Sequence, residues 1–302
     1  METDYALLAL LRRLKELGYR FQAVTPATHA RVLARPLKSA PTLHDIFGWN
    51  RPFAEADVDP DLFGLMKAAG ILLRDLEGCR SGMRVASLGD DLFLHSAYPT
   101  ESADSVFFGP DTYRFARFIE QHWPVAAVRH VVDLGAGSGA GGIVAARLAP
   151  TTAVTLVDIN PRALQLARVN ARAAGVEVKA REGREVPPGP DIVIANPPYM
   201  MDRKARSYRH GGELLGGAVA LEWTKDALIK LSRGGTMLLY TGAAIVAGVS
   251  PLLVELERTC RKAGVTLEVE EIDTDVFGEE LEQHSYSGVE RIAAMGAVLR
   301  KP

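Results

Sequence analysis

Residues 196–199, Asn-Pro-Pro-Tyr, are the residues whose types and spacing best suit chemistry. They follow an apolar run, Asp191–Ala195, that predicts a buried strand. The two prolines fix φ and carry no N–H, so the turn is rigid and its carbonyl oxygens are free to accept hydrogen bonds. With the amide of Asn196 and the flat ring of Tyr199, the motif is suited to holding a planar NH2 group. Asn196 and the Pro197 carbonyl would accept the two hydrogens, whereas a plain turn after a strand is the alternative.

A glycine-rich turn follows the strand predicted over 128–134. Gly135, Gly137 and Gly139 let the backbone approach a ligand closely, and the next helix offers free N–H groups at its start. Such turns occur in dinucleotide, flavin and S-adenosylmethionine sites. Here the spacing is Gly-x-Gly-x-Gly rather than Gly-x-Gly-x-x-Gly, and Asp133 precedes the turn. A carboxylate suits an ammonium group better than a pyrophosphate, so S-adenosylmethionine is favoured over NAD as the cofactor.

Acidic residues follow the next two predicted strands. Asp158 lies roughly 20 residues beyond the glycines, the position from which an acid accepts the ribose hydroxyl hydrogens in such folds. Capping of the following helix is the alternative role for Asp158. Glu182 and Gly183 come after the third strand and are expected beside the adenine amine, with a solvated loop charge as the alternative.

Strands and helices alternate at short spacing from about residue 126 onward, which predicts an α/β fold: a doubly wound, seven-stranded, mostly parallel sheet covered on both faces, with a terminal strand pair that could run antiparallel. The expected strands are 128–134, 153–157, 176–180, 191–195, 236–240, 267–272 and 292–299, and the expected helices are 140–148, 161–174, 221–231 and 251–263. The carboxyl ends of parallel strands meet at one edge of a sheet, so the motifs above are expected to converge there.

The first 100 residues do not show the alternation of strands and helices that is found from about residue 126 onward. Helices are expected over 5–17, 27–33 and 59–69, a short helical run over 42–49, and strands over 71–76, 84–88 and 92–95. Helices followed by a small hairpin are the order of a winged helix, and an irregular helical cap is the alternative. The helix at 59–69 contains Asp61 and one cation, Lys67, which favours substrate recognition or dimerisation over duplex binding. We therefore divide the chain into an N-terminal substrate-recognition domain, 1–100, and a cofactor-binding domain, 101–302.

The composition is that of a globular protein with a sizeable core. The chain has 302 residues, of which 47% are hydrophobic, and 35 Lys and Arg against 37 Asp and Glu give a net charge of −2. This balance supplies no overall attraction for nucleic acid or for an anionic membrane. A local basic patch could still form from the cations that flank the tetrapeptide: Arg181, Arg184, Arg203, Lys204, Arg206 and Arg209.

Cysteine usage and the start of the chain indicate the compartment. The two cysteines, Cys79 and Cys260, are far apart and lack a metal-ligand spacing, which favours a reducing compartment and argues against zinc, and no metal is expected. Residues 1–20 alternate apolar and charged residues like an amphipathic helix rather than a signal peptide or a membrane span. A cytoplasmic protein without a membrane partner is expected.

Taken together, these motifs resemble the class I S-adenosylmethionine-dependent methyltransferases, and among them the HemK/PrmC-like protein-glutamine N5-methyltransferases. The resemblance covers roughly 105–245 and includes Phe108–Thr112, similar to the family's Arg-Pro-Glu-Thr segment, although Gly109 replaces its arginine, and the glycine-rich segment 211–217. It implies cofactor contacts from Gly135, Ala136, Gly137, Ser138, Gly139, Asp158 and Asn196. It implies substrate contacts from Asn196, Pro197, Pro198 and Tyr199, of which Asn196, Pro197 and Tyr199 are assigned the catalytic role.

Three functions fit these residues. The first is methylation of an amide nitrogen in a protein, peptide or small molecule. The second is methylation of an exocyclic amine of a nucleic-acid base, since the same tetrapeptide can hold a flipped adenine stacked on Tyr199. The third is a regulator that binds S-adenosylmethionine without catalysis, which would not require the tetrapeptide. The acidic segment 277–286 is either an exposed loop or a flank of the substrate entrance.

Overall fold

The fold is built around one seven-stranded sheet. The computed structural model describes residues 2–37, 39–76, 78–100, 102–124, 127–202, 206 and 208–302. The strands lie in the order β10-β11-β9-β8-β5-β6-β7. Four neighbouring pairs are parallel, and β11 alone runs against the others because it is antiparallel to both β9 and β10. The strand bounds are β5 His130–Leu134, β6 Ala153–Asp158, β7 Lys179–Glu182, β8 Ile192–Ala195, β9 Thr236–Ile245, β10 Thr266–Asp273 and β11 Arg291–Arg300.

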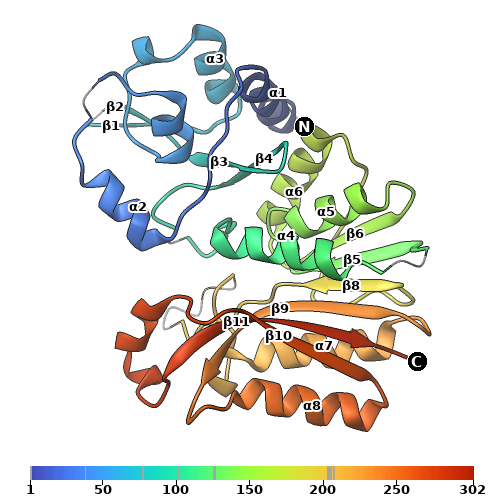
Figure 1. Cartoon of the computed structure of the whole chain (residues 1–302). Coiled ribbons are helices and arrows are strands. Elements are labelled where there is room, and N and C mark those ends of the chain that lie inside the picture. The colour runs from blue at the N-terminus through green and yellow to red at the C-terminus, as the bar shows by residue number, and fades with distance from the viewer. Residues whose placement is uncertain are drawn as a thin grey trace.

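Helices cover both faces of this sheet (Figure 1). One face packs against α4 (Pro110–His122), α5 (Ala140–Leu148) and α6 (Pro161–Ala174), and the other packs against α7 (Ala218–Lys230) and α8 (Pro251–Ala263). Alternate residues of a strand point to opposite faces. In β5, Val131 joins the core under α4 to α6, whereas Val132 joins the core under α7 and α8. Both faces are therefore buried, which explains the apolar character of these strands.

The N-terminal region contains helices followed by two hairpins. The helices are α1 Glu2–Glu16, α2 Pro26–Leu33 and α3 Pro60–Ala68, with short helical turns η1 His44–Gly48 and η2 Glu55–Asp57. The hairpins pair β1 (Leu72–Asp75) with β2 (Gly78–Ser81), and β3 (Met83–Leu88) with β4 (Asp91–Ser96). The order of helices and hairpins agrees with the sequence, and the winged-helix assignment stays a prediction.

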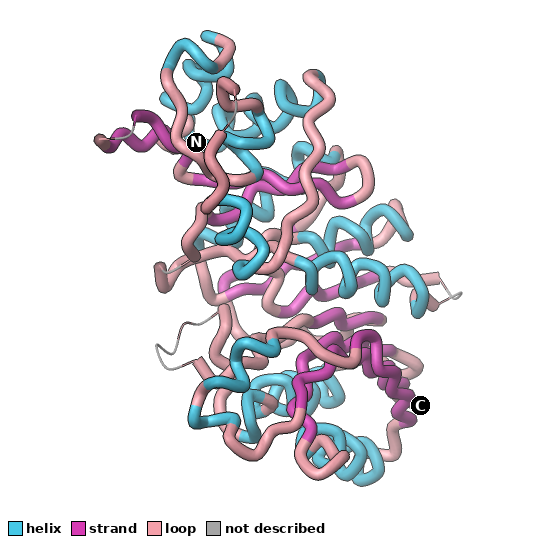
Figure 2. The backbone as a smooth tube through the Cα atoms, turned by 60° about the vertical axis from the view of Figure 1, so that its left-hand side comes forward, coloured by secondary structure: helices cyan, strands magenta, loops and turns pink. Residues whose placement is uncertain are grey.

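The N-terminal region shares a core with the sheet-containing region through α6. Leu166 and Val169 of α6 lie in the same buried cluster as leucines of α1 and α3. Asn170 of α6 is fully buried, accepts a hydrogen bond from Leu94 N of β4 at 2.9 Å, and donates to Leu94 O and Ser138 O at 3.2 and 2.9 Å. This amide therefore ties β4 to the turn that follows β5. Figure 2 shows the two regions stacked along the length of the molecule.

Several expected boundaries were wrong. The third strand of the sheet is 179–182 rather than 176–180, because residues 176–178 connect α6 to it. The strand β2 and the helix α4 were not expected. Pro110 at the first turn and Phe115, Phe118 and Ile119 on one face of α4 are a helical signal that the sequence contained. α7 begins at Ala218, three residues before the expected start at Leu221.

Candidate active site

The predicted site residues converge on one cavity at the carboxyl edge of the sheet. The cavity has a volume of about 440 Å³ and lies where the chain switches from β5–β6 to β8–β9, the place where open α/β sheets bind ligands. Of the predicted residues, it is lined by Asp133, Gly135, Ala136, Gly137, Ser138, Asp158, Gly183, Asn196, Pro197, Pro198 and Tyr199. Gly139 and Glu182 do not belong to its lining, and their roles as cofactor contacts stay predictions.

The glycine turn is shaped by close packing. Gly135 and Gly137 have φ of +72° and +53°, backbone conformations that suit glycine. A Cβ at Gly135 would lie 2.3 Å from the Trp223 ring, so the turn can lie against this tryptophan only without a side chain. Gly139 has a different structural role: a Cβ there would lie 2.9 Å from Ala167 Cβ, so Gly139 lets α5 start against α6.

Asp133 is a buried carboxyl at the floor of the cavity. Its side chain is 1% exposed, and Oδ2 accepts a hydrogen bond from Gly142 N at 2.7 Å. Burial raises the pKa of Asp133 to about 7, the Gly142 N–H lowers it, and the nearby Asp158 raises it. A carboxyl with a raised pKa gains a favourable partner when a cation binds beside it. This environment fits the predicted contact with an ammonium group.

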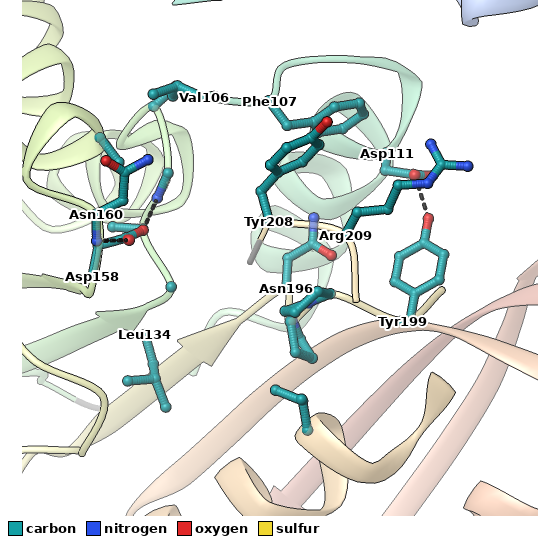
Figure 3. A pocket seen from close by; sticks show the side chains of 18 of the residues that line it. Val106, Phe107, Asp111, Leu134, Asp158, Asn160, Asn196, Tyr199, Tyr208 and Arg209 are labelled. Atoms are coloured by element: carbon teal, nitrogen blue, oxygen red, sulfur yellow. Dashed lines mark hydrogen bonds between the residues drawn. The ribbon is translucent and has the colours of Figure 1, made fainter. Parts of the chain in front are cut away.

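Asp158 bridges the glycine turn and the next loop. Oδ2 accepts a hydrogen bond from Gly137 N at 2.8 Å and Oδ1 accepts one from Asn160 N at 2.8 Å (Figure 3). Burial raises the pKa of Asp158, and these N–H groups lower it. The capping alternative is wrong, because Asn160 caps α6 with its own Oδ1 by accepting from Arg162 N. Asp158 lines the cavity, and its role as a ribose contact stays a prediction.

The tetrapeptide leaves β8 with its asparagine amide facing the cavity (Figure 3). In the described part of the chain, no group forms a hydrogen bond with the Asn196 side chain. Pro197 and Pro198 also line the cavity. The acceptor oxygen of Asn196 is therefore free to bind a ligand N–H.

Tyr199 is held tightly beneath the same cavity. It is 8% exposed, and its hydroxyl donates a hydrogen bond to Asp111 of α4. A Cβ at Gly242 would lie 2.2 Å from the Tyr199 ring, so one ring face is packed on the backbone of β9. Most of the surface that was predicted to stack on a ligand is thus covered by protein.

Asp111 is a buried carboxyl beside the tetrapeptide that the sequence did not single out as a site residue. It is 2% exposed and accepts hydrogen bonds from both Tyr199 and Tyr240, the latter at 2.7 Å. Arg114 bonds to it at 3.2 Å and to Asp273 at 2.7 Å. Burial raises the pKa of Asp111, and its tyrosine and arginine partners lower it. The sequence did contain a signal for Asp111, because this residue stands at the glutamate position of the segment that resembles the family's Arg-Pro-Glu-Thr.

Of the cations predicted to form a basic patch, Arg206 and Arg209 are paired with acids, whereas Arg181 and Arg184 are exposed and Arg184 lines the cavity. Arg206 is paired with Asp202, with Nε 2.9 Å from Oδ2, and Arg209 is paired with Glu280 and lies 3.8 Å from Asp202. Glu280 belongs to the acidic segment 277–286, which folds as two short 3-10 turns and places Phe277 in the cavity wall. This segment flanks the cavity, and the exposed-loop alternative is wrong for Glu280, which is 7% exposed. Arg203 and Lys204 lie outside the described residues.

The fold, the glycine turn and the strand-end acids define a class I S-adenosylmethionine-dependent methyltransferase. Residues 104–240 match the family model of the methyltransferase small domain. A solved structure of a candidate S-adenosylmethionine-dependent methyltransferase from Streptococcus mutans has the same fold, with a TM-score of 0.51 at 16% identity, covering 72% of this chain and 55% of that one. The predicted class, fold and cofactor are confirmed.

Curated relatives act on two kinds of substrate. The chain is 30% identical over 143 residues to a release factor glutamine methyltransferase of Rhodopirellula baltica, covering 41% of this chain and 48% of that protein. It is 34% identical over 148 residues to a ribosomal RNA small subunit methyltransferase C of Hahella chejuensis, covering 46% and 40%. The chain thus spans about half the length, or less, of these relatives. The resemblance to the glutamine methyltransferases is confirmed, and the relatives do not decide the acceptor.

Among the described helices, none combines the length and the apolar character needed to cross a membrane.

Proposed function

We propose that this chain methylates a planar NH2 nitrogen, with the side-chain amide of glutamine type in a protein, peptide or small molecule as the acceptor. The observation that carries the proposal is the free amide of Asn196 in the cavity that the glycine turn and Asp158 also line. The cavity residues fit the cofactor: Asp133 and the turn at 135–138 would hold its amino-acid part, and Asp158 its ribose. Gly183 would lie beside its adenine.

S-adenosylmethionine supplies, when bound, the methyl group on its sulfonium. The protein's own residues hold the acceptor. Asn196 Oδ1 and the Pro197 carbonyl accept the two hydrogens of the NH2 group and fix its orientation, which is the larger part of catalysis when two reactants must meet. An amide nitrogen is a weak nucleophile because its lone pair is delocalised. Acceptors on its hydrogens stabilise the positive charge that develops on the nitrogen as it gains the methyl group and the methyl–sulfur bond breaks. One of the two held hydrogens then leaves as a proton to solvent, which gives the neutral N-methyl amide.

The described cations near the site are of two kinds. Arg206 and Arg209 are neutralised by Asp202 and Glu280, so these two are not available to phosphates. Arg184 lines the cavity and, like Arg181, is exposed. Nucleic-acid binding depends on free cations that replace counterions. These arginines and the ribosomal RNA methyltransferase among the relatives are the reasons to keep adenine as the second candidate.

Methyl transfer from labelled S-adenosylmethionine into a fractionated lysate tests the proposal. Label in protein or peptide, or in a small amide, supports it, and label in RNA or DNA supports the second candidate. Asn196→Ala is expected to lose turnover while cofactor affinity, measured by calorimetry, stays within about twofold, since the amide binds the acceptor rather than the cofactor core. Normal turnover in Asn196→Ala contradicts the assignment, and binding of cofactor with no transfer to any fraction supports the regulator instead.

A further inference from the structure

Two tyrosines border the acceptor end of the cavity, and they differ in exposure. Tyr199 is buried, with its hydroxyl on Asp111 and one ring face on Gly242. Tyr208 is only partly buried and lines the cavity. Figure 3 shows its ring beside the amide of Asn196, on the side where Phe107 also lies. An aromatic surface available to a planar acceptor is therefore offered by Tyr208 rather than by the tyrosine of the tetrapeptide.

The backbone places Tyr208 here because its segment runs alongside the tetrapeptide. Met200 N donates to Arg209 O at 3.0 Å, and Gly211 N donates to Met200 O at 2.8 Å. A Cβ at Gly211 would lie 2.7 Å from Pro198 O, so this glycine is what permits the close approach. These contacts fix residues 208–211 relative to Asn196 without any contribution from a ligand.

The tyrosine ring is fixed from its other end as well. The Tyr208 hydroxyl donates to Thr100 O at 2.7 Å, and Arg206 Nη1 donates to the same carbonyl at 3.2 Å. The Arg206 guanidinium carbon lies 5.7 Å from the centre of the Tyr208 ring. Thr100 lies two residues after Tyr98, and the Tyr98 N–H donates to Oδ1 of the buried Asn50 of the N-terminal region at 2.9 Å. The ring is thus attached to the point where the N-terminal region joins the methyltransferase region.

We propose that Tyr208 is a specificity-determining residue that forms the aromatic wall of the acceptor pocket, and that its hydrogen bond to Thr100 positions this wall. The inference rests on the proposed function, because it concerns the same acceptor site. A planar amide whose hydrogens are held by Asn196 and Pro197 has its plane free for contact, and an aromatic face is the surface that such a plane packs on. A flexible aliphatic group has no such plane to lay on the ring, so the wall selects planar acceptors over aliphatic ones.

Kinetics of two variants test this role. The acceptor probes are N-acetylglutamine N-methylamide and a single-stranded, adenine-containing oligoribonucleotide. Tyr208→Ala removes the ring, and we expect the KM for the amide to rise about tenfold or more, in the range measured for lost aromatic stacking. Tyr208→Phe keeps the ring and removes the hydrogen bond to Thr100, so a smaller rise of about threefold is expected. Tyr5→Ala, at a tyrosine of α1 that is 66% exposed and remote from the cavity, is the matched control.

Cofactor affinity, measured by calorimetry, separates a local role from damage to the fold and should stay within about twofold in all three variants. An unchanged KM and kcat in Tyr208→Ala overturns the role of Tyr208 and leaves the proposed function intact. Transfer by the wild type to the oligonucleotide alone overturns the amide assignment, and the role of Tyr208 then depends on whether its KM for that probe rises. If the wild type transfers to neither probe, the labelled lysate serves as the acceptor: label in protein keeps the amide proposal, label in nucleic acid alone overturns it, and labelling by Tyr208→Ala equal to that by the wild type overturns the wall.

Discussion

Cofactor affinity should depend on pH through one buried carboxyl. Asp133 has a pKa of about 7 before ligand binds, because burial disfavours its charged form. A bound ammonium group beside it would favour the charged form and lower this pKa. Binding then requires that Asp133 loses its proton, so affinity is full above the unliganded pKa and falls as the pH drops below it. The sign is that of any acid whose pKa is lower in the complex than in the free protein.

The size of the effect follows from the pKa alone when the bound form stays ionised. The dissociation constant is multiplied by one plus the ratio of protonated to ionised carboxyl, which is about 2 at pH 7, about 11 at pH 6 and about 100 at pH 5. The same titration predicts proton release on binding. We expect about half a proton per cofactor at pH 7 and about 0.9 at pH 6, because that fraction of Asp133 is protonated beforehand.

Calorimetry measures both quantities. Titrations with S-adenosylhomocysteine, the demethylated product, from pH 5.5 to 7.5 avoid turnover and keep the ligand's amino group charged, and buffers of different ionisation enthalpy count the protons released. Asp133→Asn is the matched control, because its Oδ1 can still accept from Gly142 N while the titrating proton is gone. This variant should bind more weakly above pH 7, with affinity that depends less on pH. A flat affinity in the wild type, without buffer dependence, would refute the reasoning.

Other predictions concern the support of the site. Asp158→Ala should weaken cofactor binding about tenfold or more by calorimetry, since Asp158 lines the cavity and its carboxylate also holds the Gly137 N–H of the glycine turn; unchanged affinity would remove it from the site. Tyr199→Phe removes one hydrogen-bond partner of the buried Asp111 and should lower the free energy of unfolding in urea by about 1–2 kcal/mol. An unchanged free energy of unfolding would show that this hydrogen bond does not stabilise the fold. Burial and Arg84 lower the pKa of His29 to about 4, so stability should fall as the pH drops from about 6.5 toward 4, by up to about 3 kcal/mol, and His29→Gln should flatten that dependence.

The sheet could be predicted because its strands are buried on both faces. Runs such as 192–195 are apolar at every position, and proline and glycine mark the ends of the helices between them, as Pro161 and Gly175 do for α6. The strand β7 lies at the edge of the sheet and has the pattern Lys-Ala-Arg-Glu, with mostly exposed side chains. An edge strand of this kind carries no apolar run, so its position was misplaced by several residues.

The cofactor half of the site could be predicted from the sequence because its parts lie at the carboxyl ends of the parallel strands β5, β6 and β8. The glycine turn, Asp158 and Asn196 are each adjacent to a predicted strand, and parallel pairing alone brings them to one edge. The acceptor half depends on contacts between segments far apart in the chain. Asp111 meets Tyr199 across 88 positions, and Tyr208 meets Thr100 across 108. Local sequence patterns do not show contacts between residues this far apart in the chain. The hydrogen bonds of Asp111 and the position of Tyr208 in the cavity were therefore seen only in the folded structure.

Both halves of the site are connected to the N-terminal region, and this bears on how that region could act on the acceptor. The glycine turn packs on Trp223, and its Ser138 carbonyl accepts a hydrogen bond from Asn170. Asn170 also bonds to Leu94 of β4, so the turn has a direct link to the N-terminal region. Tyr208 donates to the carbonyl of Thr100, where the N-terminal region ends. A change in the N-terminal region is therefore expected to reach the acceptor wall through Thr100 and the cofactor turn through Asn170, and cofactor affinity measured beside the KM for the acceptor tells the two routes apart.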